Sequence, residues 1–250
     1  KNQTYKNIQI IIVDKNSADK TVQIAKHYGG RVIIGDWERS AARNKGIKES
    51  KGEYILSIDS DMELTPRVIE ECLQIIQSDN KIGGVVIPER SVGNPFWAKV
   101  RDFERSFYAH SELESARFFK RDLVIKVGGF DEEIIFFEDS SLPQKIEELG
   151  YNVRARINSV ILHHENDFSL WKWLKKKYYY GKTAWKYKSR YRRYATKQMN
   201  LFFRIRLFLN NRRFFSKPLL ALAVLLLKSL EYFSVMLGSL TGKFARSKDT

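Results

Sequence analysis

The tripeptide Asp59-Ser60-Asp61 places two carboxylates one residue apart, directly after the apolar run at residues 54–58. The run predicts a buried strand, and Thr65-Pro66 predicts that a helix begins after it. Open α/β sheets bind ligands at the carboxyl ends of their strands, and carboxylate oxygens suit Mg²⁺ or Mn²⁺. The tripeptide therefore indicates a divalent-metal site. Taken alone it is more often an ordinary turn sequence, because Asp and Ser side chains bond to their own backbone, and the sequence on both sides of it is what favours the metal.

Further polar side chains stand where predicted elements begin or end. They are Asp14 after a strand at residues 8–13, Asp139 before a helix at residues 142–149, and His163-His164 after a strand at residues 153–162. Asp139 also suits the cap of the helix that follows it. The two histidines are as typical of a plain strand end as of a metal site.

The first part of the chain alternates strands with helices. Strands are predicted at residues 8–13, 31–34 and 54–58, and helices at residues 20–28 and 38–50. This alternation is typical of a parallel sheet with crossover helices. The later predicted elements are a helix at 66–77, a strand at 83–88, an amphipathic helix within 91–116, a strand at 116–120 and a glycine-rich turn at 127–131.

Composition excludes a disordered chain and a disulfide framework. The sequence is 43% hydrophobic and 13% aromatic over 250 residues, which is enough for a proper core. Cys72 is the single cysteine, so no disulfide can form within the chain, and its place in a predicted helix favours a core role. No signal peptide is expected at the start of the sequence.

Five blocks occur in order along about residues 5–185: VDKNSADKT, ERSAARNKGI, GEYILSIDSDMELTP, VGGFDEEIIFFEDSSL and ILHHENDFSLWKWLKKKYYYGK. Together they resemble the family 2 inverting glycosyltransferases. The resemblance implies the α/β GT-A fold, a Rossmann-like, mostly parallel sheet flanked by helices. It also implies an enzyme that moves a sugar from a nucleotide-diphosphate donor, with Mg²⁺ or Mn²⁺ as cofactor.

The resemblance also implies roles for single residues. Asp14, Arg43 and Asp59 would bind the donor, and Asp59 and Asp61 would hold the metal. Asp139 would act as general base toward the acceptor hydroxyl. The remaining implied positions are Glu138, Gly129 and Phe130 on the acceptor side, and His163 or His164 as a further metal ligand.

Three departures from the family pattern accompany the resemblance. The sequence begins at KNQTYKNIQI, past the family's usual opening strand, and a sheet without that inner strand would expose two edges. Ser141 replaces an acidic residue, and Lys145 stands where arginine is usual. These departures leave an inactive or truncated glycosyltransferase-like binding module as the alternative to an active enzyme.

Charge divides the sequence near residue 167. Residues 1–167 hold 24 Lys/Arg and 27 Asp/Glu, whereas residues 168–230 hold 17 Lys/Arg and no carboxylate. We therefore expect a GT-A domain at residues 1–167 and a basic, aromatic, helical extension at residues 168–250. Interleaved aromatic and basic side chains are typical of RNA binding and equally of a membrane surface.

The apolar segment at residues 219–240 favours the membrane over nucleic acid. Lys228 and Glu231 interrupt it near its middle, so we expect a monotopic or re-entrant helix, with these two charges paired on one helix face. A helix that covers the protein's own apolar surface is the alternative. The expected location is the cytoplasmic face of a membrane, with a lipid-linked or glycan acceptor.

Overall fold

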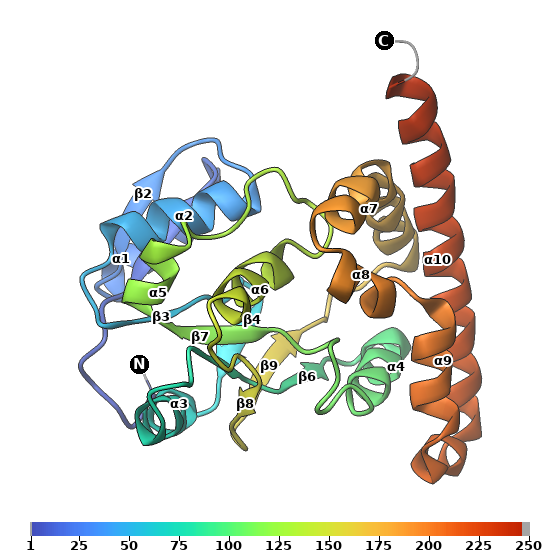
Figure 1. Ribbon diagram of the computed structural model, residues 1–250, viewed down its shortest axis with the longest axis horizontal. Helices are drawn as coiled ribbons and strands as arrows, with labels where there is room; N and C mark the ends of the chain where they lie inside the picture. The colour runs from blue at the N-terminus through green and yellow to red at the C-terminus, as the bar shows by residue number, and fades with distance from the viewer. Residues whose placement is uncertain (1, 247–250) are drawn as a thin grey trace. The chain divides into compact units, whose positions relative to one another are not determined.

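The computed structural model describes the backbone of residues 2–246 and the side chains of residues 2–242 (Figure 1). The chain divides into two compact units. Unit 1 is Lys1–Asp59, Thr65–Ile87 and Ser115–Ser159, and unit 2 is Ser60–Leu64, Pro88–Glu114 and Val160–Thr250. This division does not follow the predicted boundary after residue 167, because β4 (Met62–Leu64) and β6 (Glu89–Val92) both pair with β9 (Ile161–His164).

Unit 1 contains two separate sheets. β1 (Ile11–Asp14) and β2 (Arg31–Ile34) pair in parallel, as the sequence predicted. The second sheet has the order β3-β7-β5-β8, in which β3 (Tyr54–Leu56) pairs with β7 (Ala116–Lys120) in the antiparallel sense. In the described part of the chain no strand joins β1 to β3, so each leaves one edge unpaired.

The helices of unit 1 bury one face each on these sheets. They are α1 (Thr21–His27), α2 (Arg39–Glu49), α3 (Val68–Ser78), α5 (Arg121–Lys126) and α6 (Ser141–Glu148), and the remaining strands are β5 (Gly84–Val86) and β8 (Ala155–Arg156). The core gathers Ile47 of α2, Phe119 of β7 and Ile146 of α6, and Phe119 and Ile146 are fully buried. These helices hold the ends of β3 and β7 in fixed positions.

Unit 2 combines a small sheet with a helical layer. Its sheet has the order β4-β9-β6, antiparallel between β4 and β9 and parallel between β6 and β9. The helical segments are α4 (Phe96–Arg105), α7 (Leu170–Arg190), α8 (Arg192–Gln198), α9 (Leu201–Leu209), the 3₁₀ turn η2 (Arg212–Ser216) and α10 (Pro218–Arg246). Their core is aromatic, with Phe214 stacked on both Phe103 and Phe208.

α7 and α10 approach one another at glycines. A Cβ atom added at Gly181 would lie 2.2 Å from the carbonyl oxygen of Val235, and one added at Gly238 would lie 2.0 Å from that of Tyr178. Only glycine permits such backbone contact between two helices. Lys228 Nζ lies 2.6 Å from Glu231 Oε2 on α10, which confirms the pairing predicted for these two charges.

Candidate functional site

In unit 1, Arg43 of α2 joins the end of β3 to the segment before α6. Its Nη2 donates to Asp59 Oδ1 over 2.7 Å, and its guanidinium lies 5.3 Å from the centre of the Phe130 ring. Arg43 Nη1 is buried and has no hydrogen-bond partner among the described residues, with Glu138 Oε1 3.7 Å away. A buried N–H group without a partner is rare, and a phosphate oxygen would satisfy it.

Glu138 and Asp139 lie side by side in the 3₁₀ turn η1 (Glu138–Ser140) with different surroundings. Glu138 is 7% exposed and pairs with Arg39 Nη1 at 2.6 Å. Burial raises the pKa of Glu138 above its ordinary value and the Asp139 carboxylate adds to this, whereas Arg39 and Arg43 act in the opposite direction. Phe137, just before the turn, has a φ of +59°, a left-handed conformation that is strained for a bulky side chain.

Asp139 does not cap the helix that follows it. The N-cap position of α6 is Ser140, and no side-chain cap bond forms there. Among the described residues, no hydrogen bond or ion pair occupies the half-buried Asp139 carboxylate. The strained turn therefore presents a carboxylate that is not engaged in structure.

The glycine-rich turn of unit 1 is held by Asn44. Asn44 Nδ2 donates to the Phe130 carbonyl over 2.9 Å, and the Phe130 amide donates to Asn44 Oδ1 over 2.8 Å. Gly129 has a φ of +71°, and a Cβ there would lie 2.3 Å from Asn44 Oδ1. Lys145 Nζ donates to the Gly129 carbonyl over 2.8 Å, so this lysine orders the turn.

Asp14 ends β1 and is 6% exposed. Its Oδ1 accepts from the Ser17 amide over 2.8 Å, and its Oδ2 accepts from the Ser17 hydroxyl over 2.6 Å. The carboxylate thus orders the loop after β1 rather than joining the group around Arg43.

In unit 2, the pairing of β4 with β9 brings Asp61 to His163. Met62 lies opposite His163 in the register, and Asp61 Oδ2 lies 2.9 Å from His163 Nε2. The hydrogen bond from His163 lowers the pKa of Asp61 below its ordinary value. Burial alone would lower the pKa of His163, but hydrogen bonds to Asp61 and Glu89 outweigh burial and raise it.

The other ring nitrogen of His163 faces Arg105 and Glu89. Arg105 Nη2 lies 2.8 Å from Nδ1, and Glu89 Oε2 lies 3.7 Å from it. Arginine only donates, so in the neutral ring Nδ1 accepts from Arg105, and the Nε2 proton faces Asp61. When Nδ1 carries a proton instead, Glu89 is the carboxylate near enough to accept it.

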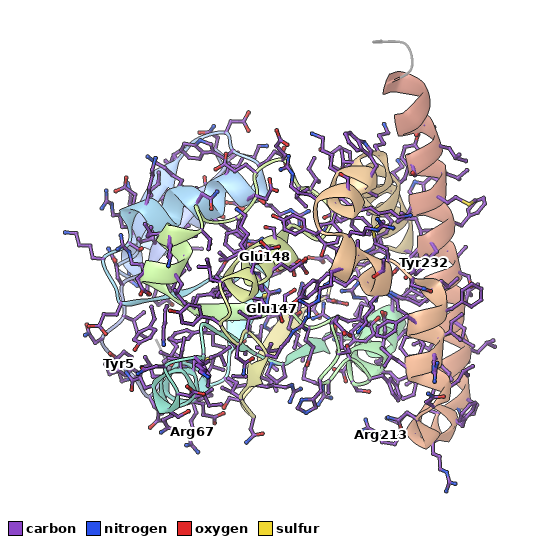
Figure 2. All side chains as sticks on the ribbon, in the orientation of Figure 1. Tyr5, Arg67, Glu147, Glu148, Arg213 and Tyr232 are labelled. Carbon is purple, nitrogen blue, oxygen red and sulfur yellow. The ribbon has the colours of Figure 1, made fainter. Side chains whose placement is uncertain are left out.

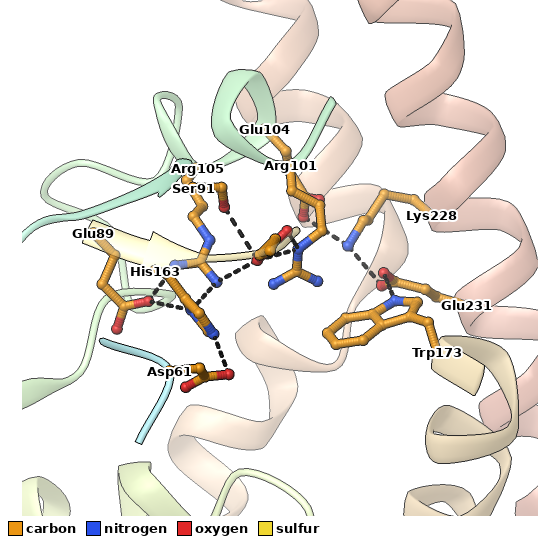
Figure 3. Close-up of polar contacts among 11 residues, drawn as sticks. Asp61, Glu89, Ser91, Arg101, Glu104, Arg105, His163, Trp173, Lys228 and Glu231 are labelled. Atoms are coloured by element: carbon orange, nitrogen blue, oxygen red, sulfur yellow. Dashed lines mark hydrogen bonds and ion pairs between the residues drawn. The ribbon is translucent and has the colours of Figure 1, made fainter. Parts of the chain in front are cut away.

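The contacts continue beyond this histidine (Figure 3). Arg105 also pairs with Glu89 and, at 3.5 Å, with Glu165, which in turn pairs with Arg101 at 2.7 Å. A second set of contacts in the same view joins Glu104, Lys228, Glu231 and Trp173. His163 is therefore held by a network of charged side chains, of which Arg101 and Glu165 are buried.

His164 lies apart from this network. Its Nε2 is 2.9 Å from Glu63 Oε2, and both side chains are exposed. Asp61 and His163 are thus brought together by the structure, whereas His164 has a different partner and Asp59 is engaged by Arg43.

The pair formed by Asp61 and His163 fits a divalent cation. Two adjacent ligand atoms that each lie about 2.1 Å from an octahedral ion are about 3 Å apart. Asp61 Oδ2 and His163 Nε2 are 2.9 Å apart, which is close to this value. Among the described residues, no group of three or more His, Cys, Asp or Glu side chains could hold a metal. The remaining positions would thus fall to phosphate oxygens and water, as is usual for Mg²⁺.

Several residues around these predicted positions were not found from the sequence. They are Arg39, Asn44 and Arg117 in unit 1, and Glu89, Arg105 and Glu165 in unit 2. They lie 16 (Glu89 to Arg105) to 99 (Arg39 to Glu138) residues from their partners along the chain, and no spacing in the sequence marks them. For Asn44 alone there was a signal, since it belongs to the ARN run of the block ERSAARNKGI.

The sequence profile described as glycosyl transferase family 2 matches residues 1–131, just over half of the 250 residues. An uncharacterized glycosyltransferase of Rickettsia typhi is 31% identical over 180 residues, which are 65% of this chain and 54% of that protein. The glucosyl-dolichyl phosphate glucuronosyltransferase of Haloferax volcanii is 25% identical over 198 residues, 66% of this chain and 63% of that protein. The chain thus spans between half and two thirds of these relatives.

A solved structure shows a similar fold. The mannosyltransferase PcManGT from Pyrobaculum calidifontis, in complex with GDP-Man and Mn²⁺, matches 96% of this chain and 80% of its own, with a TM-score of 0.64 and 16% identity. At this identity the likeness concerns the fold alone, and it confirms the predicted fold class.

Proposed function

Because the chain belongs to glycosyl transferase family 2 and is thus a glycosyltransferase, we propose that it transfers a sugar from a nucleotide-diphosphate donor with inversion at the anomeric carbon. The observation that carries this proposal is the short contact between Asp61 and His163. It offers a divalent cation two adjacent ligands and leaves the other positions to a diphosphate. The Pyrobaculum relative in fold is described with GDP-Man and Mn²⁺, which supports a nucleotide donor and a metal.

Asp61 and His163 would hold Mg²⁺ or Mn²⁺, and the bound ion would neutralise charge on the departing diphosphate. Both side chains are fixed before any ligand binds, since β4 and β9 set their register. Arg105 and Glu89 fix the ring orientation of His163 from the other side. His164, held by Glu63, is not needed for this role.

The donor would contact Arg43, Asp59 and Asp14. Arg43 Nη1 is a buried donor without a hydrogen-bond partner among the described residues, and a donor phosphate would supply an acceptor oxygen. Asp59 keeps Arg43 in place through the 2.7 Å contact, and its other oxygen lies 4.0 Å from Arg117 Nη1. Asp14 would act at the base by ordering the loop after β1.

Asp139 would serve as the general base. Its carboxylate takes the proton of the acceptor hydroxyl while the acceptor oxygen forms a bond to the anomeric carbon. The bond between that carbon and the diphosphate oxygen breaks, and the nucleoside diphosphate leaves with the electron pair. Glu138 cannot share this task easily, because it is buried against Arg39, so it would act with Gly129 and Phe130 to shape the acceptor side.

The acceptor is proposed to be lipid-linked and the enzyme to work at the cytoplasmic face of a membrane. Two observations support this: the name of the Haloferax relative contains a dolichyl phosphate sugar, and residues 168–230 of this chain carry 17 basic side chains and no carboxylate. A cationic surface attracts both anionic headgroups and phosphate-bearing acceptors.

Thermal melting with a nucleoside diphosphate and Mn²⁺ tests this function. A ligand at 100 times its dissociation constant adds about 2.7 kcal/mol of stability. Asp61→Asn should lose the metal-dependent part of this protection, whereas Asp139→Asn should keep it and stop sugar transfer. Protection that is the same with and without metal, or transfer by Asp139→Asn at the wild-type rate, contradicts the proposed roles.

A further inference from the structure

The two faces of α10 differ in what they contact. Val224, Leu227 and Glu231 on its inner face are buried in unit 2. The outer face carries large apolar side chains that are 40–69% exposed, namely Leu219, Leu222, Leu226, Phe233, Met236, Leu237 and Leu240. At 3.6 residues per turn these fall within an arc of about 100°. Figure 1 shows α4, α7 and α8 on one side of α10, α9 overlapping its lower part, and no other described element of unit 2 beyond it.

The segment Pro218–Gly242 is long and apolar enough to cross a bilayer, with 25 residues, a mean hydropathy of 1.8 and a third of its most apolar stretch buried. Its central charges do not decide between crossing and lying flat, because the protein itself neutralises them. Lys228 Nζ lies 2.6 Å from Glu104 and from Glu231, and Trp173 Nε1 donates to Glu231 over 2.6 Å. Tyr232, the next residue on α10, is labelled in Figure 2.

The packing of α7 distinguishes a helix that crosses the bilayer from one that lies flat on it, because α7 packs on α10 over the C-terminal half of this segment. The contacts run from Trp173 with Glu231 to Tyr178 with Thr241, whose hydroxyls are 3.0 Å apart. α7 also carries exposed lysines, namely Lys172, Lys175, Lys176 and Lys182. A spanning α10 would carry these charges into hydrocarbon, where charged side chains are costly. Only the outer face of α10 can meet lipid without this cost.

Charge identifies what covers the outer face. Exposed cations stand on α9, in η2 and just after it, where α10 begins, and these are Arg206, Arg212, Arg213 and Lys217 (Arg213 is labelled in Figure 2). Arg213 and Lys217 also lie over the rings of Phe107 and Phe103. Phe202 and Phe215 among these cations are 80% and 60% exposed. A second copy of this chain would bring the same positive charges against them, whereas anionic headgroups complement them. Exposed aromatic rings between cations are also typical of the membrane interface.

We propose that the outer face of α10 lies in the plane of an anionic membrane surface, buried among the headgroups along its length, and does not cross the bilayer. This deepens the membrane association proposed above and is independent of the transferase chemistry. The helix then acts as an interfacial anchor, with its inner face still packed on unit 2.

Probe depth along α10 tests the orientation. Cys72 is fully buried, so the variants Leu222→Cys, Phe233→Cys and Leu240→Cys can each carry one environment-sensitive fluorophore. Residues 222 and 240 are about 27 Å apart along a helix, nearly the thickness of the hydrocarbon layer. On vesicles with 30% phosphatidylglycerol, brominated lipids should report one shallow depth for all three probes. Deep quenching at residue 233 with shallow quenching at the other two would indicate a spanning helix and overturn the proposal.

Flotation with the same vesicles tests whether the outer face of α10 binds the membrane. Leu222→Glu/Leu226→Glu should lower the affinity for anionic vesicles at least tenfold. The matched control Ser189→Glu/Thr196→Glu has the same charge change at exposed positions of α7 and α8 and should lower it less than threefold.

Other outcomes would overturn the proposal. They are equal binding to neutral phosphatidylcholine vesicles, no vesicle binding by the wild type, or self-association that the Leu222→Glu/Leu226→Glu variant abolishes. Nucleotide protection is measured without vesicles, so it should be unchanged in both variants, which shows that they fold. Failure of nucleotide protection in the wild type would count against the proposed function alone.

Discussion

Lys228 provides the sharpest test of the packing of α10. Its ammonium group lies 2.6 Å from Glu104 Oε1 and 2.6 Å from Glu231 Oε2, and the three side chains are 5%, 6% and 7% exposed. Lys228→Met keeps the length of the side chain but leaves two carboxylates buried beside each other. Removing one partner of a buried ion pair costs about 3–5 kcal/mol of unfolding free energy. For a chain of 250 residues this lowers the melting temperature by about 6–20 °C.

The cost should depend on pH in a defined direction. Burial alone would raise the pKa of Glu231, but the charges of Lys228 and Lys177 outweigh it and lower the pKa to about 2. A lowered carboxyl pKa stabilises the fold above the ordinary carboxyl pKa, and this stability is lost as the pH falls toward 2. Without Lys228, burial outweighs the attraction of the remaining cations, so the pKa of Glu231 rises. The free energy of unfolding of the variant therefore falls as the pH rises, because the buried carboxyl group must ionise. The gap in stability between wild type and variant is therefore largest at pH 7 and narrows toward pH 4.

Urea unfolding at pH 7 and pH 5 measures both effects. Lys188→Met is the matched control, because Lys188 is exposed on α7, and it should stay within about 0.5 kcal/mol of the wild type. Glu104→Gln/Lys228→Met/Glu231→Gln should recover part of the loss, since it removes all three charges together. Equal costs for Lys228→Met and Lys188→Met, or a cost that grows as the pH falls, would refute the assignment of Lys228 to a buried ion pair.

Three further predictions concern other parts of the chain. Glu89→Gln should weaken Mn²⁺ binding about 10–100-fold, because it removes the carboxylate that lies 3.7 Å from His163 Nδ1. Titration of free Mn²⁺ measures the affinity, and Glu63→Gln is the control. Gly238→Ala should destabilise the fold, because the added Cβ would lie 2.0 Å from the Tyr178 carbonyl oxygen. Alanine by itself favours a helix over glycine by about 1 kcal/mol. A higher free energy of unfolding in urea would therefore contradict the α7–α10 contact. Burial raises the pKa of Cys72 to about 12, so a thiol reagent at pH 8 should react only with the unfolded chain, and rapid native labelling would contradict its burial.

The sequence predicted local elements better than their pairing. β7 was predicted to its residues, and α2 and α3 differ from their predictions by one or two residues at each end. β4 and β6 were missed, since each is only three or four residues long and owes its existence to β9, about 70 to 100 residues away in the sequence. The antiparallel pairing of β3 with β7 was missed for the same reason.

In the candidate site, too, the sequence predicted local features but not contacts between residues that are distant in the chain. Residue types and their places at strand ends pointed to Asp59, Asp61 and His163, because those signals are local. The partners Arg105 and Glu89 lie on an ordinary amphipathic helix and on a short strand, where a charged side chain carries no local signal. The αL conformation of Phe137 and the buried Nη1 of Arg43 are also consequences of tertiary packing, and no sequence pattern announces them.

The partners of Asp59 and Asp61 indicate that the two carboxylates are not equivalent, although they stand one residue apart. Asp59 already has a permanent cation, because Arg43 lies 2.7 Å from it and cannot lose its proton. Asp61 faces a histidine, whose Nε2 becomes a ligand in the tautomer that carries the ring proton on Nδ1, 3.7 Å from Glu89 Oε2. A divalent ion arriving at Asp61 therefore replaces a proton, whereas one arriving at Asp59 would have to compete with a guanidinium. For this reason we propose that the metal binds at Asp61 with His163, and that Asp59 organises the donor through Arg43.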